Sequence, residues 1–302
     1  MERFKTLMLR EWMQHRFGWI VIVAVPLLIA LGLSLFGQAK VELDDVKEVP
    51  MALAVAVIVI AFVTATTLGL AWSAVLLQSP GLARRDTQDR SIEFWLSLPT
   101  GHVQSVAAPL LVHLILVPLG AFACGVIGGL VLSLPIVATT TGIASWFALP
   151  WGGLLAAIVS LALRLALGIV LVTLWYSPLI LGTMAASAWL KRWGVPAVVG
   201  VVGIGGLVLD KVYGNRIVWD ALRALAVNAR HAFIATGQDP NPGRWTIQSP
   251  DDVGAVLAAV PRAVLGDAGD ALLQLASPAF LVALAIAAVA FTLLVLRRQR
   301  GA

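Results

Sequence analysis

Charged residues are scarce in this sequence. Of its 302 residues only 12% are Asp, Glu, Lys or Arg, whereas 60% are hydrophobic; soluble domains usually carry about 25% charged residues. The mean hydropathy is +0.93. This composition excludes a disordered chain and a collagen-like repeat, and one water-soluble core could hardly bury so much apolar surface.

Cysteine and the common nucleotide and metal motifs are also missing. The single cysteine, Cys124, excludes an intramolecular disulfide and a multi-cysteine zinc cluster. The four histidines are scattered, and no His-Glu-x-x-His pattern occurs. The chain also has no Gly-x-x-x-x-Gly-Lys-Ser/Thr loop. It therefore does not bind ATP through a Walker loop of its own.

Long apolar runs are what the sequence has in abundance, and a run of about 18 or more residues predicts a membrane-spanning helix. The stretch 152–190 is the difficult one, since at roughly 55 Å it is too long for one span and short for two. Lys191 and Arg192 favour one span, because short positive loops stay cytoplasmic. We expect an all-α polytopic protein, one transmembrane domain over 1–302. Its six predicted spans are residues 17–36, 51–77, 103–134, 170–190, 195–209 and 278–296.

The charge distribution predicts which way the chain is inserted. With both termini cytoplasmic, the basic clusters lie inside, so the net charge of +5 is an orientation signal and does not indicate a nucleic-acid partner. Residues 135–169 are expected to form an external re-entrant or interfacial segment. Residues 210–277 are expected to form an external helical segment with two candidate helices, 217–234 and 253–275.

Two polar segments, residues 1–16 and 79–102, are each predicted to contain a helix on the cytoplasmic side. Residues 1–16 are typical of an amphipathic helix in the inner interface, although a plain basic start to the first span is the alternative. In the connection 79–102, residues 91–98 form a short candidate helix that Pro99 and Gly101 end. Its aromatic and aliphatic face, surrounded by charges, favours a docking partner in the cytosol.

The run DRSIEFWLSLP, residues 89–99, resembles the cytoplasmic loop of permeases of the type-2 ABC exporter branch. Arg10, Glu11 and Trp12 are similar to part of that family's interfacial "elbow" helix. Pro109 departs from the family, where a lysine is usual, and the acidic lead-in at 85–88 is shifted. The resemblance implies that the short helix is a coupling helix in a groove of an ATPase. The residues it assigns to this interface are Asp86, Asp89, Arg90, Glu93, Phe94, Trp95 and Leu98.

The resemblance also implies the partners. The chain would be the permease subunit of an exporter in the bacterial inner membrane, with no enzyme activity and no cofactor of its own. ATP and Mg²⁺ would bind to two copies of a separate ATPase subunit. A second permease, identical or similar, would complete the pore. The largely apolar spans favour an amphipathic or hydrophobic substrate such as a peptide, a lipid or a small toxic compound.

Three residues within the apolar stretches are further candidates for the pathway or for packing. His113 could relay protons or simply bond a neighbouring helix, since no predicted span carries a carboxylate to pair with it. Arg164 is expected at the outer boundary as a snorkelling anchor. Pro178 marks a predicted kink. The alternative functions are an ion-coupled secondary carrier and a non-transporting scaffold or sensor that uses 210–277 for recognition.

Overall fold

The computed structural model describes residues 2–36, 49–83, 101–235, 249 and 251–300, and these are helical with no strand among them. This confirms the all-α class. The first half contains α1 (Glu2–Leu35), α2 (Met51–Leu82), α5 (His102–Leu111), the π-helical turn η1 (Val112–Leu116), α6 (Val117–Thr141) and α7 (Ile143–Phe147). The second half contains α8 (Trp151–Leu190), η2 (Lys191–Trp193), α9 (Gly194–Tyr213), α10 (Ile217–His231), α11 (Asp252–Leu273), η4 (Gln274–Ala276) and α12 (Pro278–Gln299).

Five helical stretches among the described residues are long and apolar enough to cross a membrane. This supports the membrane-protein class. One of the five, Trp151–Tyr213, joins α8, η2 and α9, where the sequence predicted two spans. The stretches are Phe4–Leu35, Met51–Leu82, His102–Thr141, Trp151–Tyr213 and Pro278–Gln299.

Two predicted segments are not separate elements. The expected external segment 135–169 is divided: its first residues complete α6, α7 follows, and residues 151–169 begin α8. At the N-terminus, α1 continues through Arg16 and Phe17 as one helix, so the helix is not interrupted between the predicted elbow and the first span. The two candidate helices in 210–277 are confirmed as α10 and α11.

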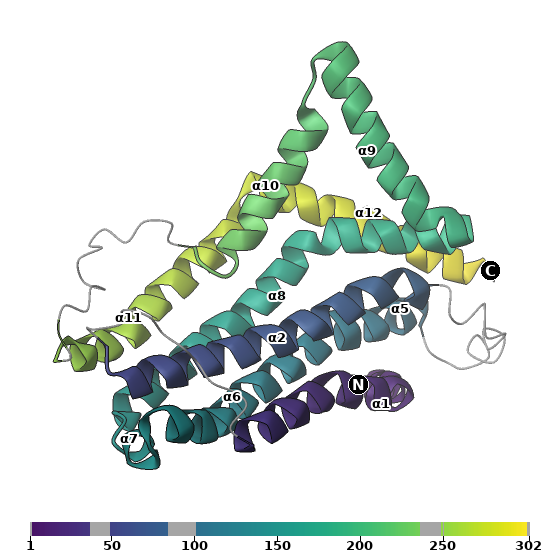
Figure 1. Cartoon of the computed structure of the whole chain (residues 1–302). Coiled ribbons are helices and arrows are strands. Elements are labelled where there is room, and N and C mark those ends of the chain that lie inside the picture. Colours follow the sequence, from purple (N-terminus) through teal and green to yellow (C-terminus); the bar gives the residue numbers. More distant parts are fainter. Residues whose placement is uncertain (1, 37–48, 84–100, 236–248, 250, 301–302) are drawn as a thin grey trace.

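The central contact of the fold is between α2 and α6, which pack along their length (Figure 1). Glycines make this approach possible. A Cβ atom added to Gly129 would lie 2.7 Å from Cα of Ile60, and one on Gly125 would lie 2.8 Å from Cα of Thr64. Small residues at such contacts let two helix backbones approach closely in a membrane.

The long helix α8 connects the two halves of the molecule, because it packs on α2, α11 and α12. Trp175 on α8 is 2% exposed and meets the ring of Phe280 on α12 edge-on at 5.1 Å. The predicted kink residue, Pro178, does not end α8, although Figure 1 shows the helix changing direction along its course. Ser177 Oγ donates to the carbonyl of Leu174 at 2.7 Å, the carbonyl that Pro178 leaves without its helical N–H partner.

The helix ends gather at two ends of the molecule. Figure 1 shows the start of α5, the α8–α9 junction and the end of α12 at one end, and α7 with the starts of α2 and α11 at the other. The predicted topology needs the first three on one side of the membrane, and their arrangement is compatible with it. The helices α9 and α10 leave the bundle and meet at a turn where Gly214 has a φ of 65°.

Candidate functional site: a buried carboxylate and two imidazoles

The residues assigned to the ATPase interface by resemblance lie outside the described residues. This applies to Asp86, Asp89, Arg90, Glu93, Phe94, Trp95 and Leu98. Among the described residues, the candidate site is a group of ionisable side chains elsewhere in the molecule. It lies where α1 packs against α5 and η1.

Glu11 is the first member of this site. Although expected in the membrane interface, it is fully buried, with 0% exposure. The guanidinium of its neighbour Arg10 contacts carboxylate oxygen Oε1, with Nε at 3.2 Å and Nη2 also bonded. Arg10 is 17% exposed, and Trp12 on the other side of the helix is 44% exposed. A buried carboxylate beside a cation is an arrangement that balances charge locally.

His113 is the second member, and it is 1% exposed. Its Nε2 atom lies 3.6 Å from Oε2 of Glu11. The sequence-based statement that no span offers His113 a carboxylate is therefore wrong, because α1 carries Glu11 into the bundle. Within the described part of the chain, neither ring nitrogen of His113 has a hydrogen-bond partner. A buried polar group in this condition calls for a physical reason.

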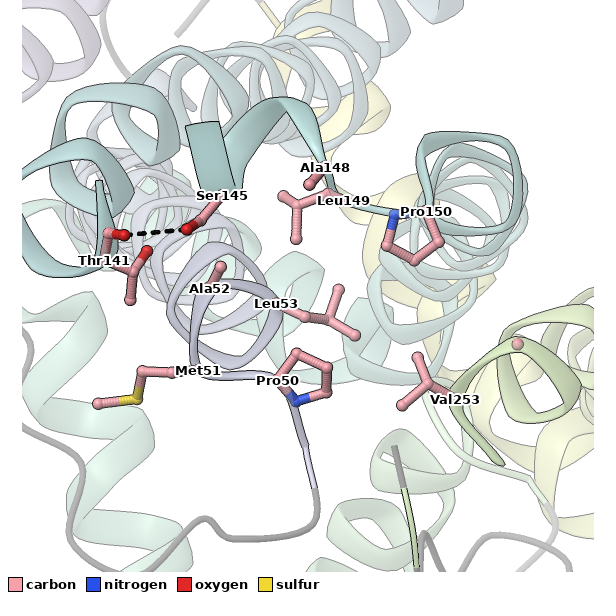
Figure 2. Close-up of a pocket in the computed structure, with 11 residues that line it drawn as sticks. Pro50, Met51, Ala52, Leu53, Thr141, Ser145, Ala148, Leu149, Pro150 and Val253 are labelled. Atoms are coloured by element: carbon pink, nitrogen blue, oxygen red, sulfur yellow. Dashed lines mark hydrogen bonds between the residues drawn. The ribbon is translucent and has the colours of Figure 1, made fainter. Parts of the chain in front are cut away.

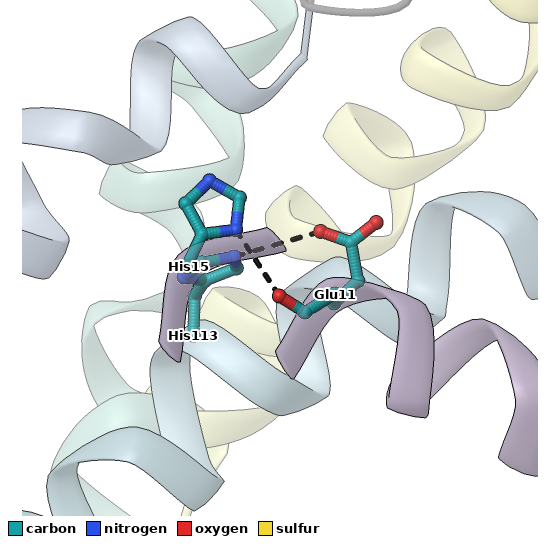
Figure 3. A group of neighbouring side chains, drawn as sticks. All are labelled: Glu11, His15 and His113. Atoms are coloured by element: carbon teal, nitrogen blue, oxygen red, sulfur yellow. Dashed lines mark hydrogen bonds and ion pairs between the residues drawn. The ribbon is translucent and has the colours of Figure 1, made fainter. Parts of the chain in front are cut away.

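His15 is the third member, one helical turn after Glu11 on the same face of α1. Its Nδ1 atom donates to the backbone carbonyl of Glu11 at 3.1 Å. The rings of His15 and His113 meet edge-on at a centroid distance of 4.8 Å, and Figure 3 shows the carboxylate and the imidazoles converging from two helices. One ligand atom from each of the three residues lies within 4.8 Å of the others. This chemistry suits a proton or a divalent cation.

The local backbone around His113 is irregular. Residues Val112–Leu116 form a π-helical turn, and Pro118 follows directly after Val117. Thr173 on α8 donates to the carbonyl of Leu114 at 3.2 Å, a carbonyl that Pro118 cannot serve as an α-helical donor. Single π-turns occur frequently at functional sites. Here the turn presents His113 toward α1.

The sequence reasoning missed this site for an identifiable reason. Residues 11, 15 and 19 recur at helical spacing, and Trp19 is indeed buried at 4% exposure near His113, with ring centroids 5.8 Å apart. That periodicity crosses the boundary drawn at residue 16 between elbow and span. Following one face of a single helix across the boundary would have placed Glu11 and His15 together. It would not have supplied His113, which is distant in sequence.

Arg164 is not the exposed anchor that the sequence predicted. It is 4% exposed, and its Nε donates to Oδ2 of Asp267 on α11 at 2.7 Å. The prediction is wrong because α11 covers this part of α8 and supplies a carboxylate. A paired and buried arginine is a structural connection between helices rather than a snorkelling side chain.

A cavity of about 510 Å³ lies at the opposite end of the bundle from the end of α12. Figure 2 shows its wall, formed by the start of α2, the α6–α7 and α7–α8 junctions, and Val253 on α11. Leu53, Leu149 and Val253 make it mainly apolar, and Thr141 and Ser145 supply the hydroxyl groups. Both hydroxyls already have backbone acceptors, Ser145 donating to the carbonyl of Thr141 at 2.9 Å and Thr141 to that of Val137 at 3.1 Å.

No family model matches this chain, and comparison with curated proteins and with solved structures gave no match either. The resemblance to ABC permeases is carried by the sequence alone: residues 89–99, the Arg10-Glu11-Trp12 run, the predicted six-span layout, and the break at 175–178 before Lys191 and Arg192.

Proposed function

We propose that the chain is the membrane-spanning permease subunit of an ATP-driven ABC exporter. The observation that carries the proposal is the sequence DRSIEFWLSLP at residues 89–99, between two long apolar helices. The absence of a Walker loop from the chain is compatible with it, because the ATPase would be a separate subunit. In the proposed complex two ATPase subunits bind ATP and Mg²⁺, and two permeases complete the pore.

The helices on either side of this segment could transmit a movement to the rest of the molecule. The segment follows α2 and precedes α5, which continues through η1 into α6. Because the backbones of α2 and α6 approach each other closely, a displacement of residues 84–100 would act on both members of that pair. This is the mechanical relationship that coupling to an ATPase requires.

Sidedness supports the same assignment. The start of α5, the end of α12 and the α8–α9 junction share one end of the molecule (Figure 1). Arg297 and Arg298 lie in the last turn of α12, and Lys191 and Arg192 lie at the α8–α9 junction. Basic residues gathered at one end favour a cytoplasmic position for it. We propose six spans, with α8 and α9 crossing separately, both termini inside and the membrane the bacterial inner membrane.

The proposed substrate is amphipathic or hydrophobic: a peptide, a lipid or a small toxic compound. The largely apolar lining of the 510 Å³ cavity is compatible with this class. Charged side chains are few in the sequence, and among the described residues the buried Glu11 and Arg164 are each paired with an opposite charge.

The deciding experiment measures binding to a candidate ATPase, a Walker-containing protein to be sought among the products of the neighbouring genes. Trp95→Ala and Glu93→Arg should each weaken co-purification and reduce ATP turnover in the reconstituted complex. Losing an aromatic anchor of about 2 kcal/mol corresponds to roughly 30-fold weaker binding. Trp193→Ala is the matched control, because Trp193 is 64% exposed and lies outside the motif.

The outcomes separate coupling from simple lipid anchoring. If Trp95→Ala and Trp193→Ala behave alike, Trp95 is one interfacial tryptophan among others. If both motif variants keep unchanged binding and unchanged ATP turnover, the proposed coupling function is wrong. Vesicles with both subunits should also show ATP hydrolysis that increases with substrate; a chain that binds no ATPase and moves nothing would be the scaffold or sensor alternative.

An ion-coupled carrier is the second candidate, and one observation favours it. The fold brings two carboxylates into the helix packing that the sequence had not placed there, the buried Glu11 and the partly buried Asp267, each beside an arginine. Buried ionisable residues in membrane proteins commonly mark ion pathways. Transport by the chain alone in vesicles, driven by a proton gradient and independent of ATP, would establish this function in place of the exporter.

A further inference from the structure

We propose that Glu11, His15 and His113 bind a divalent transition-metal ion of the zinc class, which would connect α1 to the turn η1. The inference is independent of the exporter proposal. It concerns three residues of this chain that lie outside the segment 84–100 in the sequence.

The donor set defines the class of ion. One carboxylate oxygen and two imidazole nitrogens are ligands that Zn²⁺ accepts, at distances near 2.0–2.2 Å. Calcium and magnesium prefer oxygen donors only, whereas imidazole suits Zn²⁺ and its first-row neighbours. Three protein ligands leave a fourth tetrahedral position for water, which the partial exposure of His15 allows.

The distances are close to what such an ion needs. Ligand atoms about 2.0 Å from a tetrahedral metal are about 3.3 Å from each other. Nε2 of His113 and Oε2 of Glu11 are 3.6 Å apart, and the ligand atoms of all three residues lie within 4.8 Å of one another. Glu11 and His15 stand one turn apart on α1 (Figure 3), so rotation of the three side chains is the movement that would bring their ligand atoms to the distances that such an ion needs.

His113 supplies an independent second observation. It is 1% exposed, and among the described residues neither of its ring nitrogens has a hydrogen-bond partner. The 3.6 Å separation from Glu11 is longer than a hydrogen bond. A buried imidazole facing a carboxylate at this distance, on a π-helical turn, has the orientation of a ligand whose metal would fill the gap.

Arg10 is the competitor of the metal. Its guanidinium occupies Oε1 of Glu11, and this positive charge opposes a second cation beside the same carboxylate. Arg10 is 17% exposed, so its head group can move toward water when a metal binds. The site should therefore bind metal more tightly when Arg10 is replaced by a neutral residue. An ion pair without a metal site would not show this increase in metal affinity.

The test uses the full chain, purified in detergent and freed of metal with a chelator. Zn²⁺ binding is measured by titration calorimetry, and Co²⁺ is used as a spectroscopic probe of coordination. The wild type should bind one ion per chain. Glu11→Gln and His113→Gln should each weaken binding at least tenfold, as losses even beyond the direct ligands cost about 10–100-fold. Arg10→Gln should strengthen binding several-fold.

The control is His231→Gln, which removes a histidine on α10 far in sequence from the cluster and should leave the affinity unchanged. If His113→Gln does not fold, wild type and Arg10→Gln still decide the matter, since a metal that binds the native state raises the thermal midpoint. No Zn²⁺-dependent shift in either protein, or Zn²⁺ binding unchanged in Glu11→Gln, would mean a structural ion pair only and overturn the proposal. Failure here leaves the ATPase-binding experiment unaffected.

Discussion

The guanidinium of Arg164 bonds two helices at once: Nε donates to Oδ2 of Asp267 at 2.7 Å, and Nη1 donates to the carbonyl of Ala232 at 2.6 Å. The other carboxylate oxygen, Oδ1, accepts from the backbone N–H of Ala235 at 2.8 Å. One ion pair therefore fixes α8, α11 and the end of α10 relative to one another. These contacts hold the segment after α9 against the long helix α8.

Neutralising this pair should destabilise the protein strongly. Asp267→Asn keeps the shape of the side chain but leaves the Arg164 charge buried without its counterion. Breaking a buried pair in this way costs about 3–5 kcal/mol. The free energy of unfolding in detergent, measured by denaturant titration, checks the value.

The chain offers a matched control in Asp210→Asn. Asp210 faces Arg216 at 3.7 Å, and the side chain of Arg216 is 62% exposed. Removing an exposed pair should change the unfolding free energy by about 0.5 kcal/mol or less. Equal effects of the two substitutions would contradict the role given to Arg164.

The α2–α6 contact predicts opposite responses at two glycines of α6. Gly129→Ala places a Cβ atom 2.7 Å from the backbone of Ile60, so the helices must move apart, at a cost of about 1–3 kcal/mol. Gly120→Ala meets nothing within 4 Å and should be neutral or stabilising by up to about 1 kcal/mol. Thermal unfolding of both variants makes the comparison, and a Gly129→Ala protein as stable as the wild type would contradict the close packing.

The hydroxyl of Thr173 should contribute more to the free energy of unfolding than the hydroxyl of Thr183 on the same helix. Thr173 bonds the carbonyl of Leu114 on η1 at 3.2 Å as well as that of Ile169, whereas Thr183 bonds only Ile180 in its own helix. Thr173→Val should cost about 0.6 kcal/mol more than Thr183→Val, the mean of such interhelical bonds in membranes. Unfolding free energies measured side by side test this difference.

Cysteine labelling tests whether α8 and α9 cross the membrane separately. Starting from Cys124→Ala, which removes the single cysteine, Asn215→Cys should react with a membrane-impermeant maleimide added outside intact cells. Gln299→Cys should react only after the membrane is opened, and both positions are exposed. Protection of position 215 in intact cells, with labelling after opening, would mean that α9 does not span.

Sequence periodicity predicted the elements that local chemistry determines. The turn residues between residues 234 and 253 separated two amphipathic patterns, and α10 and α11 end within a few residues of the predicted positions. The apolar runs likewise predicted the long helices, because hydrophobicity over about 20 residues is a local property. Their exact ends differed, since α2 continues to Leu82 and α6 to Thr141.

Charge pairing could not be predicted in the same way. Arg164 and Asp267 are 103 residues apart, and Asp267 belongs to a segment that composition placed outside the membrane. Glu11 was assigned to an interfacial helix because residues 1–16 have an amphipathic pattern with basic residues around it, and because Arg10, Glu11 and Trp12 resemble the elbow helix of the permease family. The pairing of both carboxylates depends on which helices pack together, and that information is not contained in any short window of the sequence.

The length of α8 has a mechanical consequence. Its 40 residues measure about 60 Å, against a hydrocarbon core of about 30 Å. Pro178 has no N–H to bond the carbonyl of Leu174, so one backbone hydrogen bond along the helix is missing there. Ser177 bonds this carbonyl from within the same turn and therefore does not replace the bond between successive turns. Bending stiffness is therefore lowest at this point. Pro178 thus divides α8 into a longer part that contains the buried Arg164 and a shorter part that ends before Lys191. A bend between these two parts would not leave the carbonyl of Leu174 unpaired in the lipid, because Ser177 already bonds it.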